Sequence, residues 1–216
     1  MKRRIFLRAG AGLMALGLVA ACGETSGGDD AVADVAETSS TVTAVLDTTL
    51  GPIIVEVYPD AAPLSAGDFL AHLDQGLYDG AGFFRLVTPE NDRGSPQIEV
   101  IQMQLAEGVE GLPPVAHETT EMTGLRHVDG ALSLARGDVG TGSAGSFFIT
   151  IGDQPGLDFG GMRNPDGQGF AVFGRVVEGM DVVRAIQARP TDPEADDDYV
   201  KGQILLEPVT FTAHRQ

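Results

Sequence analysis

The sequence predicts a mainly β fold in which short strands are joined by glycine-rich turns. Its 216 residues include 29 glycines and no tryptophan, and only 6% are aromatic, which fits a loop-rich sheet protein better than a helical bundle. Eight runs have the composition of strands. They are residues 43–48, 53–58, 82–87, 98–103, 131–135, 147–151, 171–177 and 204–211. Such a series indicates a closed barrel or a sandwich, and the pattern alone does not choose between them.

The first two strands are expected to pair as a hairpin, because Leu-Gly-Pro at residues 50–52 is a turn signal. Ile53, Val55 and Val57 occupy alternate positions of the second strand, so we expect them to share one face. In the third strand the same alternation puts Phe84 and Leu86 on the face opposite Arg85. We therefore expect Phe84 to pack in the core, as we do the later phenylalanines Phe147 and Phe173.

Two helices are predicted between the strands. Ser65 and Asp68 have the spacing of a capping box, with Asp in place of the usual Glu or Gln. The first helix is therefore expected to open at Ser65 and to end at Gly76 or Gly80. A second, short amphipathic helix is predicted near residue 180 from three apolar residues at helical spacing, Met180, Val183 and Ile186.

The chain is strongly acidic, with 31 Asp and Glu against 14 Lys and Arg and a formal net charge of −17 at pH 7. This charge argues against nucleic acid or anionic lipid as a partner. A saline habitat would account for it, although a solvated acidic surface is the simpler interpretation. The four histidines have no metal-ligand spacing, so no metal or other cofactor is expected. We expect the protein to be a monomer.

The first 22 residues resemble an export signal. A basic head containing Arg3, Arg4 and Arg8 resembles a twin-arginine motif, and the apolar run after it is too short to span a bilayer. Residues 19–22, Val-Ala-Ala-Cys, resemble a bacterial lipobox. Cys22, the only cysteine in the sequence, is therefore expected to be lipidated and to anchor the exported protein to the membrane of the cell envelope, on its periplasmic or outer face.

Residues 23–41 are small, polar and acidic, with no aromatic side chain. Such a segment cannot bury enough apolar surface to order itself, so we expect a flexible tether between the lipid and the folded domain. The folded domain is predicted to comprise residues 42–214.

Arg85 is the most informative residue of the sequence. It lies in Gly-Phe-Phe-Arg-Leu-Val, and three further motifs follow it. They are Ile-Glu-Val-Ile-Gln, which ends at Gln102, Ser-Phe-Phe-Ile-Thr at residues 146–150 and Gly-Phe-Ala-Val-Phe-Gly at residues 169–174. In this order the four motifs resemble the cyclophilin-type peptidyl-prolyl cis-trans isomerases, and the likeness covers residues 42–213.

The resemblance implies a closed eight-stranded antiparallel β-barrel capped by two α-helices, and an enzyme that acts on proline-containing polypeptides. Arg85 would be the catalytic donor, and Gln102 would hold Arg85 or the substrate carbonyl. Three side chains match the wall of the family's proline pocket, and the backbone at residues 135–136 matches a stretch that binds the residues before proline. The substrate-binding candidates are Val100, Ala135, Arg136, Phe148, Leu157 and Phe170.

The sequence departs from the family pattern in four places. Met103 and Gln104 replace the usual Gly-Gly, where their side chains could reach the groove floor. Ser146 stands where Gln or Glu is common, and Phe170 where His or Tyr is common. Gly156 falls near a position that is Trp in members sensitive to cyclosporin, so weak cyclosporin binding is expected. The loop at residues 88–97 is longer than in compact members, and we expect it to border the groove and to tune substrate entry.

The sequence therefore predicts an exported prolyl isomerase that assists the folding of extended or unfolded proteins. The alternative is a proline-peptide binding module or chaperone that kept the fold and lost most of the catalysis. Gly-x-Gly-x-x-Gly at residues 140–145 does not indicate a nucleotide site, because a strand and not a helix follows it.

Overall fold

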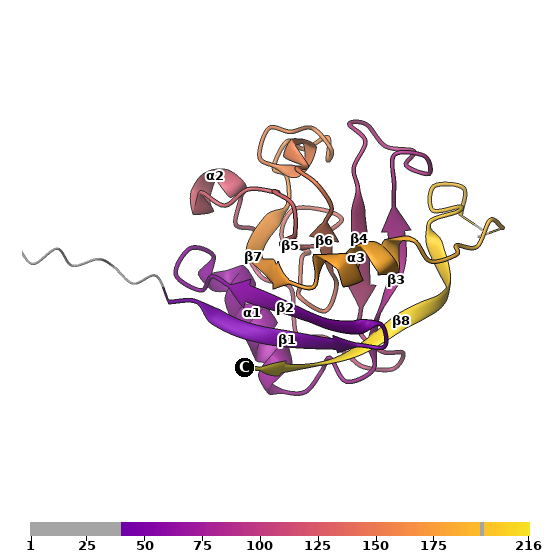
Figure 1. The fold of residues 1–216 in the computed structure, drawn as a ribbon. Coiled ribbons are helices and arrows are strands. Elements are labelled where there is room, and N and C mark those ends of the chain that lie inside the picture. Colours follow the sequence, from indigo (N-terminus) through magenta and orange to yellow (C-terminus); the bar gives the residue numbers. More distant parts are fainter. Residues whose placement is uncertain (1–39, 195–196) are drawn as a thin grey trace, which may run out of the picture. The chain divides into compact units, whose positions relative to one another are not determined.

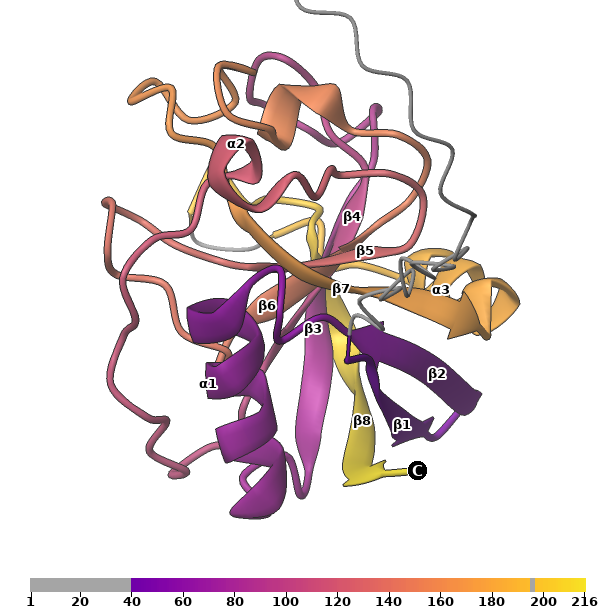
Figure 2. The ribbon, with the colours of Figure 1, turned by 90° about the vertical axis from the view of Figure 1, so that its left-hand side faces the viewer.

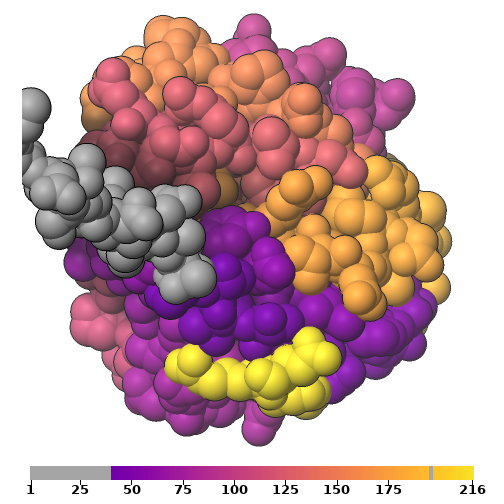
Figure 3. Space-filling view, turned by 60° about the vertical axis from the view of Figure 1, so that its left-hand side comes forward, coloured from indigo at the N-terminus to yellow at the C-terminus, as the bar shows by residue number. Residues whose placement is uncertain are grey.

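The computed structural model describes residues 40–194 and 197–216, which form a closed barrel of eight antiparallel strands (Figure 1). The order around the barrel is β1-β2-β7-β5-β6-β4-β3-β8, and pairing of β8 with β1 closes it. Figure 3 shows the yellow C-terminal strand lying beside the indigo N-terminal strands at this seam. The strands are β1 (Val42–Thr48), β2 (Gly51–Val57), β3 (Ala81–Val87), β4 (Val100–Gln104), β5 (Ala131–Leu134), β6 (Phe147–Thr150), β7 (Ala171–Glu178) and β8 (Ile204–Arg215).

The fold class implied by the resemblance is thus confirmed, and so is the hairpin of β1 and β2. The predicted signal with Cys22, and residues 23–39 of the predicted tether, lie outside the described residues. In the part of the chain that the structure describes, no helix is both long and apolar enough to cross a membrane.

Two helices cover the barrel core from different sides (Figure 2). Helix α1 (Pro63–Asp74) buries Phe69, whose ring lies 5.8 Å from that of Phe147 and 5.4 Å from that of Phe173. Helix α3 (Met180–Gln187) buries Val183 and Ile186. The expectation of two helices was incomplete, because a four-residue helix, α2 (Thr120–Thr123), lies between β4 and β5.

The predicted start of α1 was wrong. The helix begins at Pro63, two residues before Ser65, and no side chain of the adjoining residues caps it. The carboxylate of Glu118 takes that place: it accepts hydrogen bonds from the backbone nitrogens of Leu64 and Ser65 at 3.1 and 2.7 Å. Asp68 instead accepts from a distant backbone nitrogen, that of Ala144, at 2.6 Å. The C-terminal prediction was right, since Gly76 follows the helix with a φ of +67°.

Candidate active site

Strand β3 is irregular at the point where it carries the arginine. Phe83 and Arg85 pair with consecutive residues of β4, so Phe84 is an extra residue and forms a β-bulge. A regular strand would put Phe83 and Arg85 on one face. The bulge lets Phe83 and Leu86 both pack in the core while Arg85 faces outward into a groove. The prediction that Phe84 packs in the core was wrong, since it is only partly buried and lies outside the core cluster.

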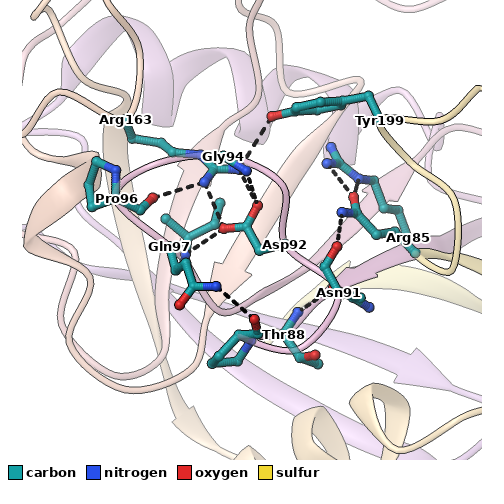
Figure 4. Close-up of polar contacts among 12 residues, drawn as sticks. Arg85, Thr88, Asn91, Asp92, Gly94, Pro96, Gln97, Arg163 and Tyr199 are labelled. Carbon is teal, nitrogen blue, oxygen red and sulfur yellow. Dashed lines mark hydrogen bonds and ion pairs between the residues drawn. The ribbon is translucent and has the colours of Figure 1, made fainter.

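Two amide side chains hold Arg85. Its Nε and Nη2 donate to Oε1 of Gln203 at 3.0 and 2.7 Å, and its Nη1 donates to Oε1 of Gln102 at 3.1 Å. Gln203 is fully buried, and its amide nitrogen donates to the carbonyl oxygen of Asn91 at 2.8 Å, which keeps its oxygen toward the guanidinium. The ring of Tyr199 lies near the same guanidinium, with its centre 5.8 Å from Cζ (Figure 4).

The charge of Arg85 is not neutralised by a carboxylate in the described part of the chain, where the buried arginine–aspartate pairs involve other arginines. Burial lowers the pKa of Arg85, and the interaction with Tyr199 partly offsets this. Because the ordinary pKa of arginine is above about 12, the group stays protonated at neutral pH. Three of its five N–H groups bond the two amides, which leaves two for a ligand in the groove.

Gln102 is oriented in turn by Ser146. Its Nε2 donates to the Ser146 hydroxyl oxygen at 3.2 Å, and that hydroxyl donates to the carbonyl oxygen of Met103 at 2.9 Å. The Met103 side chain itself is fully buried in the barrel core, because alternation along β4 turns it away from Gln102. The expectation that Met103 and Gln104 reach the groove floor was wrong, since Gln104 is exposed and lines a neighbouring hollow.

An apolar pocket adjoins Arg85. Val87, Val100, Phe148 and Leu157 form a buried cluster separate from the barrel core. The ring of Phe170 meets that of Phe148 edge to face, with 5.5 Å between the ring centres. The groove that opens over this cluster has a volume of about 330 Å³. All eight residues predicted as catalytic or substrate-binding line this groove, namely Arg85, Val100, Gln102, Ala135, Arg136, Phe148, Leu157 and Phe170.

The side chain of Arg136 is buried and ties down the loop that carries Phe170. It forms a bidentate ion pair with Asp166 at 2.7 and 2.9 Å and donates twice to the carbonyl oxygen of Gly169, at 2.8 and 2.6 Å. The hydrogen bonds that Arg136 donates to the carboxylate are the main cause that lowers the pKa of Asp166 to about 2. The guanidinium also lies over the Phe170 ring, 5.2 Å from its centre. Arg136 thus fixes one wall of the pocket.

A buried polar cluster backs Phe148. The imidazole of His127 stacks on the Phe148 ring at 5.9 Å, with Nδ1 2.8 Å from Oδ1 of Asp158 and Nε2 3.0 Å from the hydroxyl oxygen of Ser133. Burial lowers the pKa of His127, so the ring is neutral, donates from Nδ1 and accepts the Ser133 hydroxyl at Nε2. Burial raises the pKa of Asp158, but the hydrogen bonds from His127 outweigh it and hold that pKa below its usual value.

Gln203, Tyr199 and His127 were not predicted as part of the site. The sequence pointed only to the loop at residues 88–97 as a further neighbour of the groove. That loop does contact the site, because the carbonyl oxygen of Asn91 accepts a hydrogen bond from the amide of Gln203. Among residues 40–194 and 197–216, no three His, Cys, Asp or Glu side chains gather as a metal site would require.

The barrel has the fold of the cyclophilins, and residues 43–207 match the family model described as cyclophilin type peptidyl-prolyl cis-trans isomerase/CLD. The chain therefore belongs to the cyclophilin-type peptidyl-prolyl cis-trans isomerases, and it is an enzyme of that class.

Individual relatives agree with this assignment. The chain is 33% identical over 149 residues to peptidyl-prolyl cis-trans isomerase cyp18 of Streptomyces antibioticus, which covers 69% of this chain and 85% of that protein. It is 28% identical to peptidyl-prolyl cis-trans isomerase B of Escherichia coli (strain K12), over 75% of this chain and 94% of that protein. A cyclophilin structure from Cryptosporidium parvum matches with a TM-score of 0.59 at 17% identity, over 82% of this chain and 98% of that one, a likeness of fold alone.

Proposed function

We propose that the enzyme isomerises X–Pro bonds by donating a hydrogen bond from Arg85 to the prolyl nitrogen. Rotation about the amide has a barrier of about 20 kcal/mol and takes roughly 10–100 s without a catalyst. To bring this time to milliseconds, an enzyme must raise the rate by about 10⁴-fold, which corresponds to lowering the activation free energy by about 5.5 kcal/mol. As the amide twists, the nitrogen becomes pyramidal and its lone pair becomes an acceptor. A fixed charged donor therefore stabilises the transition state more than the ground state.

One observation carries this proposal: a charged guanidinium with two unused N–H groups stands beside an apolar pocket. The proline ring would fill the pocket against Phe148, Leu157 and Phe170. Gln102 would keep the guanidinium aligned, and the backbone at residues 135–136 would bind the residues before proline. Arg85 would then lie next to the bond that twists.

The departures from the family pattern fit an active enzyme. Met103 faces the core and leaves the groove open, and Phe170 supplies a flat apolar wall. At Gly156 a side chain has no room, because a Cβ there would lie 2.5 Å from Cγ of Pro96. No large aromatic side chain can stand at that point, so we expect cyclosporin to bind weakly.

The N-terminal sequence supports the proposal that the clients are exported or unfolded proteins outside the cytoplasmic membrane. An export signal would carry the chain across, a lipid on Cys22 would hold it, and residues 23–41 would let the domain reach its clients. The double variant Arg3→Lys with Arg4→Lys tests the route: the twin-arginine route predicts precursor trapped in the cytoplasm, and normal export would exclude it.

The catalytic proposal is tested by isomerisation of an Ala-Pro-Phe type peptide by residues 41–216. Arg85→Ala should lower kcat/KM by about 100-fold or more, as expected for a lost transition-state donor. Arg175→Ala, an exposed arginine on β7, is the matched control and should leave the rate unchanged. Equal rates for wild type and Arg85→Ala would refute the proposal. Background rates in wild type with retained peptide binding would favour the alternative of a binding module.

A further inference from the structure

The segment between α3 and β8 reaches Arg85 from two directions. Gln203 bonds the guanidinium through its amide oxygen, and Tyr199, four residues earlier, places its ring 5.8 Å from Cζ of the same group. Gln203 is fully buried, whereas Tyr199 is 49% exposed and lines the groove. Gln203 therefore supports Arg85 within the protein, and Tyr199 offers a free aromatic surface beside it.

Tyr199 lies in a segment that is held firmly. Arg93 donates to the carbonyl oxygens of Asp198 and Lys201 at 2.6 and 3.1 Å, and Asn91 donates to that of Gly202 at 2.9 Å. These bonds fasten the segment to the loop at residues 88–97 on both sides of the tyrosine.

The hydroxyl of Tyr199 is anchored as well. Its oxygen accepts a hydrogen bond from Nη2 of Arg163 at 3.3 Å (Figure 4). Arg163 is itself fixed by a bidentate pair with the fully buried carboxylate of Asp92, at 2.6 and 2.8 Å, and by a bond to the carbonyl oxygen of Pro96 at 2.9 Å. The hydroxyl of Tyr199 is thus hydrogen-bonded to a buried ion pair, that of Arg163 with Asp92.

The order of the strands indicates which part of a bound peptide would lie beside Tyr199. From Ala135 to Tyr199 the groove runs over β6, β4 and β3, which are neighbours in that order between β5 and β8. Ala135 directly follows β5, and Tyr199 precedes β8. If the residues before proline lie beside Ala135 and the prolyl nitrogen lies at Arg85 on β3, the chain after proline leaves toward Tyr199.

We propose that Tyr199 is a specificity-determining residue whose ring contacts the substrate residue that follows proline and favours a large apolar side chain there. This rests on the proposed placement of the substrate in the groove. A large apolar side chain would bury its surface against the exposed ring, whereas glycine would bury almost none.

The test compares two peptides, Ala-Ala-Pro-Phe and Ala-Ala-Pro-Gly, with the full chain and three variants. Tyr199→Ala should raise both KM and the dissociation constant for the phenylalanine peptide by about 5–10-fold, with kcat within about two-fold. It should leave both constants for the glycine peptide unchanged. Tyr199→Phe keeps the ring and should keep the preference. The matched control is Tyr58→Ala, at a partly buried tyrosine directly after β2.

An equal effect of Tyr199→Ala on the two peptides, or a fall in kcat alone, would overturn the proposal, because Tyr199 would then serve Arg85 and not the substrate. No change with either peptide would also overturn it. The dissociation constants, measured by titration followed by NMR, decide this even if wild type does not turn over the peptides. Failure of the catalytic proposal, which Arg85→Ala tests, is therefore distinguishable from failure of this one.

Discussion

Arg85 is positioned by amide side chains, and this choice of partner has a chemical consequence. A carboxylate at the same distance would neutralise the guanidinium and compete with a weak acceptor such as the prolyl nitrogen. Amide oxygens fix the plane of the group and leave its full charge. Gln203 provides two of the three hydrogen bonds, so it is the main positioning residue.

Replacement of Gln203 by alanine should therefore slow catalysis without removing the donor. Hydrogen bonds to charged groups contribute about 1.5–3 kcal/mol each, so we expect kcat to fall by about 10- to 100-fold while KM changes little. Gln75→Ala, an exposed glutamine just after α1, should match wild type. Steady-state kinetics with a proline peptide make the comparison, and an unchanged kcat in Gln203→Ala would remove the positioning role.

Arg85, Gln102, Phe148 and Phe170 could be predicted because they lie in short motifs that follow one another in a distinctive order. Alternation turns Gln102 and Phe148 to the groove, whereas Arg85 was identified from the family motif and owes its orientation to the bulge in β3. Gln203 and Tyr199 could not be found this way, since Gln203 lies 118 positions from Arg85 and follows an irregular acidic stretch. Their roles depend on which loops the closed barrel brings together, and no local pattern encodes that.

At the scale of the element, the bulge in β3 decides which side chains face the groove. The alternation rule assumes a regular strand. It correctly placed Arg85 and Leu86 on opposite faces, but it placed Phe84 in the core because it does not foresee a bulge. The start of α1 shows the same limit. The Ser65–Asp68 spacing is a local cap signal, but the buried carboxylate of Glu118, more than fifty residues away, satisfies the helix nitrogens instead.

The bulge predicts unequal roles for two adjacent phenylalanines. Phe83 is fully buried in the core, so Phe83→Ala should lower the free energy of unfolding by about 3–5 kcal/mol. Phe84 is the extra, partly buried residue, and Phe84→Ala should cost about 1 kcal/mol. Urea denaturation of the two variants measures both values. A larger loss for Phe84→Ala than for Phe83→Ala would mean that the strand is regular in solution, with Phe84 in the core.

The cluster behind Phe148 predicts a pH dependence of stability. Burial lowers the pKa of His127 in the folded protein, so the unfolded chain binds its proton more readily. The contribution of the neutral His127 to the free energy of unfolding is therefore fully present above the pKa of the unfolded chain, about 6.5. It is lost as the pH falls below that value. Between pH 8 and 5.5, the unfolding free energy of wild type should fall more steeply than that of His127→Asn. Parallel pH profiles would contradict a neutral buried imidazole.

At the scale of the whole molecule, the closed barrel places the groove across three adjacent strands, β6, β4 and β3. Strand patterns predicted the number of strands and left barrel and sandwich open, because they define faces and not closure. Closure depends on pairing of β1 with β8, from opposite ends of the folded domain. The family resemblance, which carries information on topology, supplied the barrel.

The proposed anchor predicts where the mature protein is found. Wild type should sediment with membranes and incorporate a labelled fatty acid, because a lipidated Cys22 would hold it there. Cys22→Ser should lose the label and appear in the soluble fraction after export. Membrane association of Cys22→Ser equal to that of wild type would contradict lipidation.

The central claim, that Arg85 stabilises the twisted amide more than the bound substrate, is tested most directly by separating exchange from binding. NMR exchange spectroscopy on a proline peptide gives the cis–trans interconversion rate on the enzyme, and titration of the same sample gives the dissociation constant. The account predicts that Arg85→Ala slows interconversion by about 100-fold or more while the dissociation constant changes by less than about five-fold. An interconversion rate that stays near wild type, or a loss of binding that alone explains the lost turnover, would contradict it.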